Sequence, residues 1–233
     1  MKSLTSLVAL APLLFAMGGG PAAAFDCTKA QSPVEKAICA DAKLKASFFF
    51  TGRFYRNPAF KKVIQQLHAA GHYLGPHSDS HLLYCDWNKR DSLLVTRDQF
   101  DKDLLQNYSE MARFGIHRKD APFFLPPYEW YNDSIAGWTR QLGLQLINYT
   151  PGTRSNADYT TPDSKNYRTS DEIYASITGY GKYPREGLNG AILLLHIGAG
   201  PKRTDKFYRR LPALLRYLKE NHYLPVTVPQ LLR

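Results

Sequence analysis

The chain has 233 residues, of which 44% are hydrophobic, and it carries a formal net charge of +10. This length is sufficient for one domain with a sizeable core. The basic residues are scattered along the chain, and no nucleic-acid-binding motif is present. We therefore expect a solvated basic surface that favours anionic envelope polymers, and we exclude nucleic acid as a partner.

Residues 1–24 have the pattern of a secretory signal peptide. Lys2 supplies the positive start, residues 7–17 are apolar, and Ala22 to Ala24 form a small-residue cleavage site. The apolar stretch is too short for a bilayer span, which takes about 20 residues, and no later segment is longer. We expect an exported protein, periplasmic or extracellular, without a membrane span.

Residues 25–46 form a short polar segment with a predicted helix start at Ser32-Pro33. In an oxidising compartment its Cys27 and Cys39 could pair, which would leave Cys85 as the odd thiol. The strings FDC, SPVEKAIC and AD resemble the N-terminal motif of the LprI-type lysozyme inhibitors, small exported helical proteins. This resemblance covers about 22 residues and implies lysozyme as a second candidate partner.

Residues 47–233 alternate short apolar runs with helical patterns, which is typical of βα units. The predicted strands are 48–50, 72–75, 121–125, 144–149, 191–195 and 224–228. The predicted helices are one that starts at Asn57-Pro58 and ends at Gly71, one capped by Thr96 and Gln99 that ends at Gly115, one around 135–142, one capped by Ser170, and 204–221, where Pro212 indicates a kink or a late start. Strands that are apolar on both faces predict a parallel α/β sheet, and this many units favours a barrel over an open sheet.

The most specific chemical pattern is His77-Ser78-Asp79-Ser80-His81, which directly follows the second predicted strand. Two imidazoles at this spacing can converge on one ion, and neutral imidazole suits Zn²⁺ and its neighbours. A catalytic metal usually has a third protein ligand and keeps a position open for water. The alternative is a pair of surface histidines in a polar loop.

Other unusual residues also follow predicted strands: 127–130 after the third, 150–154 after the fourth, and His196 at the end of the fifth. In βα barrels the active site is built from loops at the carboxyl ends of the strands. Four clusters at the same end of one sheet favour an active site over the surface-histidine alternative.

Four of these stretches resemble, in order, the motifs of NodB-type polysaccharide deacetylases, carbohydrate esterase family 4. They are SFFFTG at 47–52, GHYLGPHSDSH at 71–81, FFLPPY at 123–128 and LLLH at 193–196. The resemblance implies a distorted (β/α)₇ barrel and a divalent metal, commonly zinc. It also implies a hydrolase that removes N- or O-acetyl groups from a peptidoglycan-like or chitin-like polysaccharide. Removal of an N-acetyl group would make it a hydrolase of carbon–nitrogen bonds other than peptide bonds.

Carried over by motif, the resemblance implies a role for each matching residue. His77 and His81 would be metal ligands, the backbone N–H of Tyr128 would face the oxyanion, and His196 would be the general acid. A strand-end histidine bonded to a neighbour is the alternative for His196. The remaining candidates are substrate-binding residues. Trp130 and Tyr131 could form a sugar-stacking platform or lids over the core. The family's fourth motif has an aspartate and a tryptophan that are not recognisable in residues 148–156, and Arg154 or Asp158 could substitute there.

The chain departs from the family pattern in its first and third motifs. The strand that ends in paired aspartates, which supplies the general base and the third metal ligand, has no counterpart, and Asp26 is only a superficial echo. Leu125 stands where the third motif has an arginine. We therefore expect an incomplete barrel with impaired activity. The alternative is a non-catalytic carbohydrate-binding or lysozyme-interacting envelope protein.

Overall fold

The computed structural model describes residues 5–11, 44–183 and 185–232. The chain divides into two compact units. We call Phe48–Asn148 the middle unit, and Met1–Ser47 with Tyr149–Arg233 the flanking unit. Both units combine helices with short strands, so the predicted mixed α/β class is confirmed, whereas closure of the strands into a barrel is not seen in the described part of the chain. Among the described residues, no helix has the length and apolarity that crossing a membrane requires.

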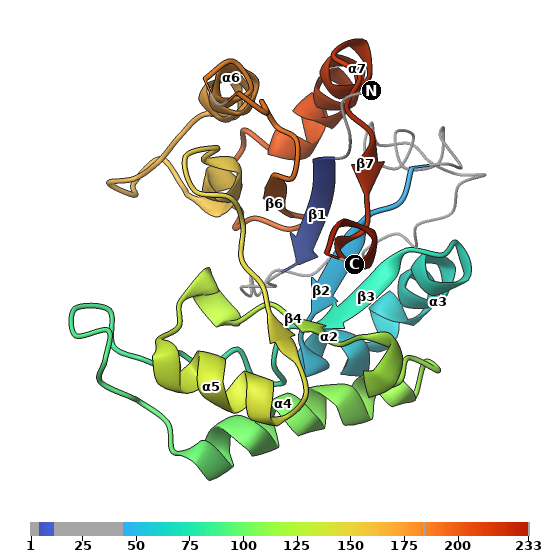
Figure 1. The fold of residues 1–233 in the computed structure, drawn as a ribbon, viewed down its shortest axis with the longest axis vertical. Helices are drawn as coiled ribbons and strands as arrows, with labels where there is room; N and C mark the ends of the chain where they lie inside the picture. The colour runs from blue at the N-terminus through green and yellow to red at the C-terminus, as the bar shows by residue number, and fades with distance from the viewer. Residues whose placement is uncertain (1–4, 12–43, 184, 233) are drawn as a thin grey trace. The chain divides into compact units, whose positions relative to one another are not determined.

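The middle unit follows an order of short strands and covering helices (Figure 1). Its elements are β2 (Ser47–Phe50, which begins at the last residue before the unit), α2 (Gly52–Arg56), η2 (Pro58–Phe60), α3 (Lys61–Ala69), β3 (Tyr73–Pro76), α4 (Arg97–Ala112), η3 (Arg118–Asp120), β4 (Phe123–Phe124), η4 (Pro127–Glu129), α5 (Asp133–Gln141) and β5 (Gln145–Leu146). Strands β2 and β3 are neighbours, and β4 pairs in parallel with β5.

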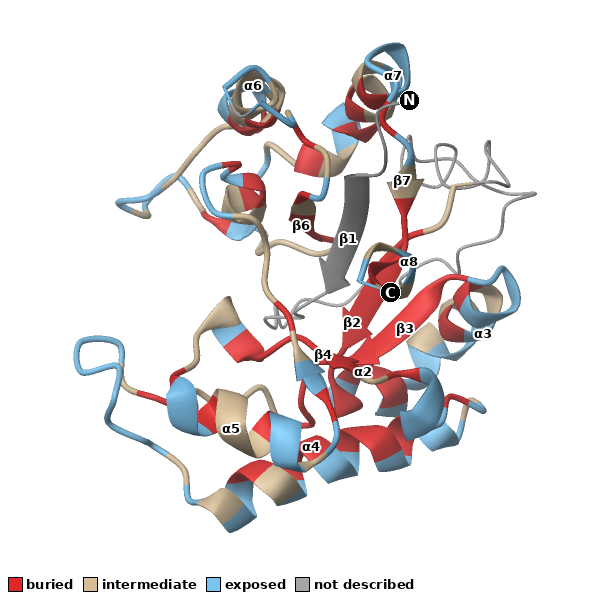
Figure 2. Cartoon of the chain, viewed as in Figure 1, coloured by how far each residue is buried: buried red, intermediate tan, exposed pale blue. Residues whose placement is uncertain are grey.

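The core of the middle unit is built from β2 and β3, which are buried along their whole length, and from one face of α4 (Figure 2). Phe50 stacks on Phe54 of α2 with 4.2 Å between the ring centroids. On α4, Phe100, Leu104 and Met111 are fully buried, and their spacings of four and seven residues place them on one helix face. This packing fixes α4 beside the loop that follows β3.

The flanking unit contains β1 (Thr5–Ala11), η5 (Ser155–Tyr159), α6 (Ser170–Tyr180), β6 (Ile192–His196), η6 (Phe207–Arg210), α7 (Leu211–Glu220), β7 (Pro225–Val226) and α8 (Val228–Leu231). Strand β1 pairs in parallel with β6 and with β7, and Leu10 lies opposite His196. Buried side chains of β6, α6 and α7, among them Leu193, Ile177 and Leu214, form one hydrophobic cluster.

Most predicted elements are present, although β4, β5 and β7 are shorter than expected. The capping box of Thr96 and Gln99 is confirmed, and Asn57 accepts a hydrogen bond from Ala59 N at the start of η2. Helix α7 has the late start that Pro212 indicated, since it begins at Leu211 after η6.

The predicted cap at Ser170 is wrong by one residue. Thr169 holds the extended N-cap conformation, and its hydroxyl accepts from Glu172 N, while the Glu172 carboxylate reaches back to Thr169 N. This reciprocal pair satisfies two helix-end donors. If Ser170 were the N-cap, the third helical position would be Ile173, whose side chain cannot accept a hydrogen bond.

Of the N-terminal region 1–46, the structure describes residues 5–11 and 44–46. Residues 5–11, inside the predicted signal peptide, form β1 in the full chain. The predicted helix start at Ser32-Pro33 and the pair Cys27 and Cys39 lie outside the described residues. Cys85 is buried as a free thiol.

Candidate functional site

The loop after β3 brings His77 and His81 together. Their ring centroids are 4.9 Å apart at an interplanar angle of 66°. His77 is fully buried, and its Nδ1 lies 2.8 Å from the carbonyl oxygen of Leu125. Because a carbonyl only accepts, Nδ1 carries the proton and donates, and the basic lone pair is therefore on Nε2. This is the tautomer that a metal-binding histidine requires.

The backbone of this loop is held by polar side chains from α4. Asn107 Oδ1 accepts from His77 N at 2.8 Å, and Asp103 Oδ1 accepts from Ser80 N at the same distance. The other oxygen of Asp103 accepts from the Tyr84 hydroxyl at 2.7 Å, and burial raises the pKa of the Asp103 carboxyl. Helix α4 thus fixes the positions from which the two imidazoles project.

Asp79, in the middle of the loop, is paired with α2. Arg56 donates to both of its carboxylate oxygens at 2.5 and 3.0 Å, and this hydrogen bonding raises the pKa of Arg56. Gly52 makes the approach feasible, because a Cβ there would lie 1.9 Å from Asp79 Oδ1. The carboxylate of Asp79 is thus engaged by Arg56 rather than by the histidine pair.

Tyr128 packs against this loop from η4. Its ring centroid is 4.4 Å from that of His81. Tyr128 and Glu129 both adopt left-handed backbone conformations, with φ of 59° and 54°, as do Ser78 and His81 in the facing loop. Non-glycine residues with positive φ are strained, and such strain gathers where a structure positions functional groups.

Trp130 and Tyr131, which follow β4, contact the loop that contains Asp86 and Arg90. Trp130 is half-buried, its indole N–H donates to Asp86 O at 3.1 Å, and the Arg90 guanidinium lies 4.3 Å above its ring. Arg90 also lies 5.4 Å from the centroid of Tyr131. By contrast, Trp87 is 52% exposed.

In the flanking unit, His196 ends β6 and pairs with Asp158 of η5. Asp158 Oδ1 lies 2.6 Å from His196 Nδ1, and Oδ2 accepts from His196 N at 2.7 Å. Both side chains are 2% exposed. The carboxylate fixes the ring orientation and places the proton on Nδ1, which leaves Nε2 as the nitrogen that exchanges a proton with a ligand. Arg154 is exposed and caps the same η5 segment with a left-handed backbone.

Comparison with known proteins identifies the family of the chain. The family described as polysaccharide deacetylase matches residues 26–147, which is more than half of the chain. The chain belongs to the polysaccharide deacetylase family. A comparison with curated proteins found no match.

Solved structures of this family share the fold. The Bc1960 peptidoglycan N-acetylglucosamine deacetylase has a TM-score of 0.67 at 16% identity, over 98% of this chain and 91% of that one. An acetyl xylan esterase from Clostridium thermocellum, solved with a cobalt ion, has a TM-score of 0.63 at 21% identity, over 97% and 90%. The BA3943 pseudoenzyme from Bacillus anthracis has a TM-score of 0.63 at 16% identity, over 100% and 67%.

The histidine pair has part of the chemistry that a divalent metal ion requires. The two imidazoles lie close together, and the tautomer of His77 fits a divalent ion. No group of three His, Cys, Asp or Glu side chains suited to a metal occurs within 5–11, 44–183 and 185–232. Residues 12–20, which follow β1 in the sequence, contain no carboxylate, and Asp26 lies outside the described residues. The donor chemistry of the histidine pair therefore fits a divalent ion, and no third His, Cys, Asp or Glu side chain among the described residues is grouped with it.

The position of the family's third-motif arginine is apolar in this chain. Leu125 is 1% exposed, and its contribution to the site is its backbone carbonyl, which orients His77. A guanidinium buried there would need a carboxylate partner to offset its desolvation. Leucine at this position is consistent with the absence of the paired aspartates.

The sequence predicted that His77 with His81, residues 127–130, residues 150–154 and His196 lie at the same end of one sheet. The first two clusters belong to the middle unit, whereas residues 150–154 and His196 belong to the flanking unit. Sequence reasoning did not find the supports of the loop. The sequence signal for them is that Asp103, Asn107 and Glu110 recur at helical spacing. The structure shows that all three are buried on α4. Asp158 was only one of two alternatives for the fourth motif, and its contact with His196 now distinguishes it from Arg154.

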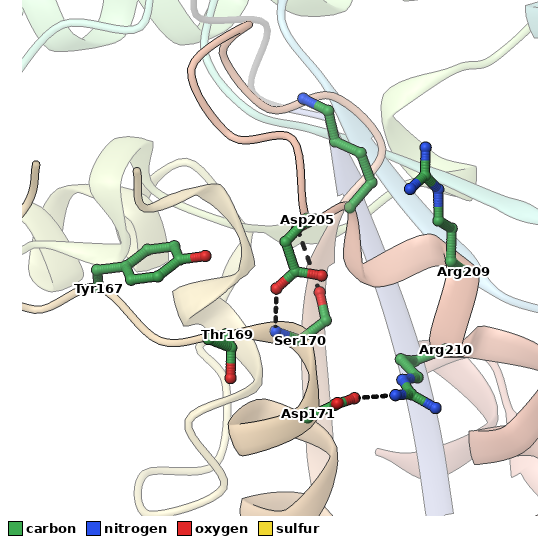
Figure 3. A pocket seen from close by; sticks show the side chains of 8 residues that line it. Tyr167, Thr169, Ser170, Asp171, Asp205, Arg209 and Arg210 are labelled. Carbon is green, nitrogen blue, oxygen red and sulfur yellow. Dashed lines mark hydrogen bonds and ion pairs between the residues drawn. The ribbon is translucent and has the colours of Figure 1, made fainter. Parts of the chain in front are cut away.

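A separate hollow in the flanking unit, with a volume of about 560 Å³, is lined by Tyr167, Thr169, Ser170, Asp171, Asp205, Lys206, Arg209 and Arg210 (Figure 3). Two of its carboxylates have partners. Asp205 accepts from Ser170 N at the start of α6, and Asp171 forms an ion pair with Arg210. Neither His196 nor Asp158 lines it, so we do not assign the proposed chemistry to this hollow.

Proposed function

We propose that the chain is an exported, metal-dependent hydrolase that removes N- or O-acetyl groups from a carbohydrate polymer. The observation that carries the proposal is the histidine pair, with ring centroids 4.9 Å apart and a His77 tautomer that leaves Nε2 basic. A divalent ion such as Zn²⁺ bound to these imidazoles would polarise an acetyl carbonyl and lower the pKa of a bound water.

We propose roles for the other residues that agree with their positions in the structure. Tyr128 would present its backbone N–H to the oxyanion of the tetrahedral intermediate. His196 would protonate the leaving amine or alcohol from Nε2, because Asp158 keeps the Nδ1 proton in place. Arg154, Trp130 and Tyr131 remain candidate substrate-binding residues.

Acetate release tests the catalytic half of the proposal. The full chain is incubated with zinc and acetylated chitooligosaccharides or peptidoglycan fragments, and free acetate is measured. We expect release by the wild-type chain and a loss of at least roughly 100-fold for His196→Ala, since general acid catalysis contributes on that order. No release from any substrate would contradict the proposal.

Metal analysis tests the other half. Zinc content after dialysis is measured for the wild-type chain and for His77→Ala and His81→Ala, with His117→Ala as a control at an exposed histidine. We expect the first two variants to lose the ion and the control to keep it. Equal zinc content in all four proteins would remove the histidine pair as the site.

A second candidate function is a carbohydrate-binding protein without catalysis. The absence of a third ligand among the described residues favours it, as does the structural likeness to the BA3943 pseudoenzyme. Sugar binding without acetate release, in a zinc-loaded sample, would support this alternative. The lysozyme proposal rests on residues 25–46, and inhibition of lysozyme by the chain would test it.

A further inference from the structure

Residues 84–94 form a hairpin-like loop between residues 77–81, which we call the histidine loop, and α4. Cys85 and Leu93 form an antiparallel bridge, and Leu94 N donates to Tyr84 O at 2.9 Å. At its turn, Asp86 Oδ1 accepts from the backbone N–H groups two and three residues later, and these bonds lower the pKa of Asp86. Its backbone is therefore fixed by local bonds.

This loop is also tied to the segment 130–132. The Trp130 indole donates to Asp86 O at 3.1 Å, Arg90 Nε donates to Tyr131 O at 2.6 Å, and Asn132 Nδ2 donates to Arg90 O at 3.0 Å. The Arg90 guanidinium lies over the Trp130 ring, which adds a cation–π contact. Trp130 and Tyr131 thus hold the loop in place, and the residue that the loop presents is Trp87.

Trp87 displays an indole that the fold does not bury. Its side chain is 52% exposed although its ring contacts Tyr128 at 5.5 Å and Trp130 at 5.5 Å. Tyr128 is 36% exposed and contacts His81 at 4.4 Å. A large aromatic surface held in a fixed position beside polar groups is typical of a ligand site, because the ordering entropy is lost before binding.

We call the exposed rings of Trp87 and Tyr128 the Trp87 surface. We propose that this surface binds a pyranose ring of the polysaccharide, namely the sugar unit next to the one that loses its acetyl group. The ligand class rests on the proposed function. A pyranose with equatorial substituents offers a flat face of C–H groups to the indole and hydroxyls to the polar groups of Asp86 and Arg90 around it. Two successive ring contacts separate the indole from His81, so the stacked sugar is a chain neighbour rather than the acetylated residue at the metal site.

Binding measured without catalysis tests this inference. The full chain, treated with a chelator, is titrated by calorimetry with N-acetylglucosamine, chitotetraose and fully acetylated chitohexaose. We expect Trp87→Ala to weaken hexaose binding roughly tenfold or more, and Trp87→Phe to stay within a few-fold of wild type, since a smaller aromatic face remains. Monosaccharide binding should not differ between wild type and Trp87→Ala.

Two controls make the result specific. Tyr183→Ala removes an aromatic side chain that is 89% exposed in the flanking unit, and it should leave binding unchanged. Far-UV circular dichroism and a melting curve check that Trp87→Ala is folded. If the folded Trp87→Ala binds chitohexaose like wild type, or if wild type binds no oligosaccharide, the inference is overturned.

The outcomes also separate this inference from the proposed function. Trp87-dependent binding without acetate release by the zinc-loaded chain would keep the Trp87 surface and contradict the deacetylase proposal. Acetate release that is unchanged in Trp87→Ala on the hexaose would do the reverse.

Discussion

The pair of His196 and Asp158 gives the most quantitative prediction. Asp158 accepts two hydrogen bonds from one residue, from the His196 ring at 2.6 Å and from its backbone N–H at 2.7 Å. Both side chains are 2% exposed, so water cannot replace the carboxylate without opening the structure. Asp158→Ala therefore leaves two buried donors without an acceptor.

The expected loss of stability follows from that count. A buried donor that loses its partner costs about 1–3 kcal/mol, so Asp158→Ala should lower the free energy of unfolding by about 2–6 kcal/mol. Asp158→Asn keeps one acceptor oxygen but turns an NH₂ group toward the second donor. It should lower the free energy of unfolding by about 1–3 kcal/mol. Typical domains have a total stability of about 5–15 kcal/mol, so either change is large.

Urea denaturation followed by circular dichroism measures these differences. The matched control is Asp163→Ala, which removes an exposed carboxylate that pairs with Lys202 at the surface and should leave the unfolding midpoint nearly unchanged. If Asp158→Ala unfolds at the same urea concentration as this control, the two hydrogen bonds do not stabilise the fold and the reasoning is refuted. Acetate release should also fall in both Asp158 variants, because His196 loses the group that orients its ring.

Three further predictions concern the histidine loop and the N-terminus. Gly52→Ala places a Cβ against Asp79 Oδ1 and should lower the free energy of unfolding by about 1–3 kcal/mol. The control is Gly137→Ala in α5, which has open space around it and should not destabilise the protein. Equal melting temperatures for the two variants would contradict this prediction. Burial raises the pKa of Asp103, so the folded state holds that proton more tightly than the unfolded chain. The wild-type chain should therefore lose stability relative to Asp103→Asn as the pH rises from about 4 through the raised pKa. Parallel curves of stability against pH for the two proteins between pH 3 and 7 would refute this prediction. If residues 1–24 are a signal peptide, N-terminal sequencing of the exported protein should begin at Phe25; a retained Met1 would instead agree with β1 as a permanent strand.

Much of the fold was predictable because its signals are local. The apolar run at 48–50, the Asn57 cap and the capping box of Thr96 each lie within a few residues, and short-range sterics and hydrogen bonds determine them. The cap at Thr169 was missed by one residue, because adjacent threonine and serine have nearly the same capping chemistry. Glu172 distinguishes them, because it lies at the third helical position only when Thr169 is the N-cap.

The candidate site divides in the same way. The four-residue spacing of His77 and His81 predicted their convergence from the sequence by itself, because two residues that close in the chain remain close in a tight loop. The partner of His196 is 38 residues away in the sequence, and the supports of the histidine loop come from a helix that begins 16 residues after it. Trp87 and Trp130 have the same chemistry, and only packing decided that one holds the loop while the other faces solvent. Residue types and short spacings therefore determined which chemistry is available, while the tertiary structure decided which distant groups meet, because such contacts depend on how the whole chain packs.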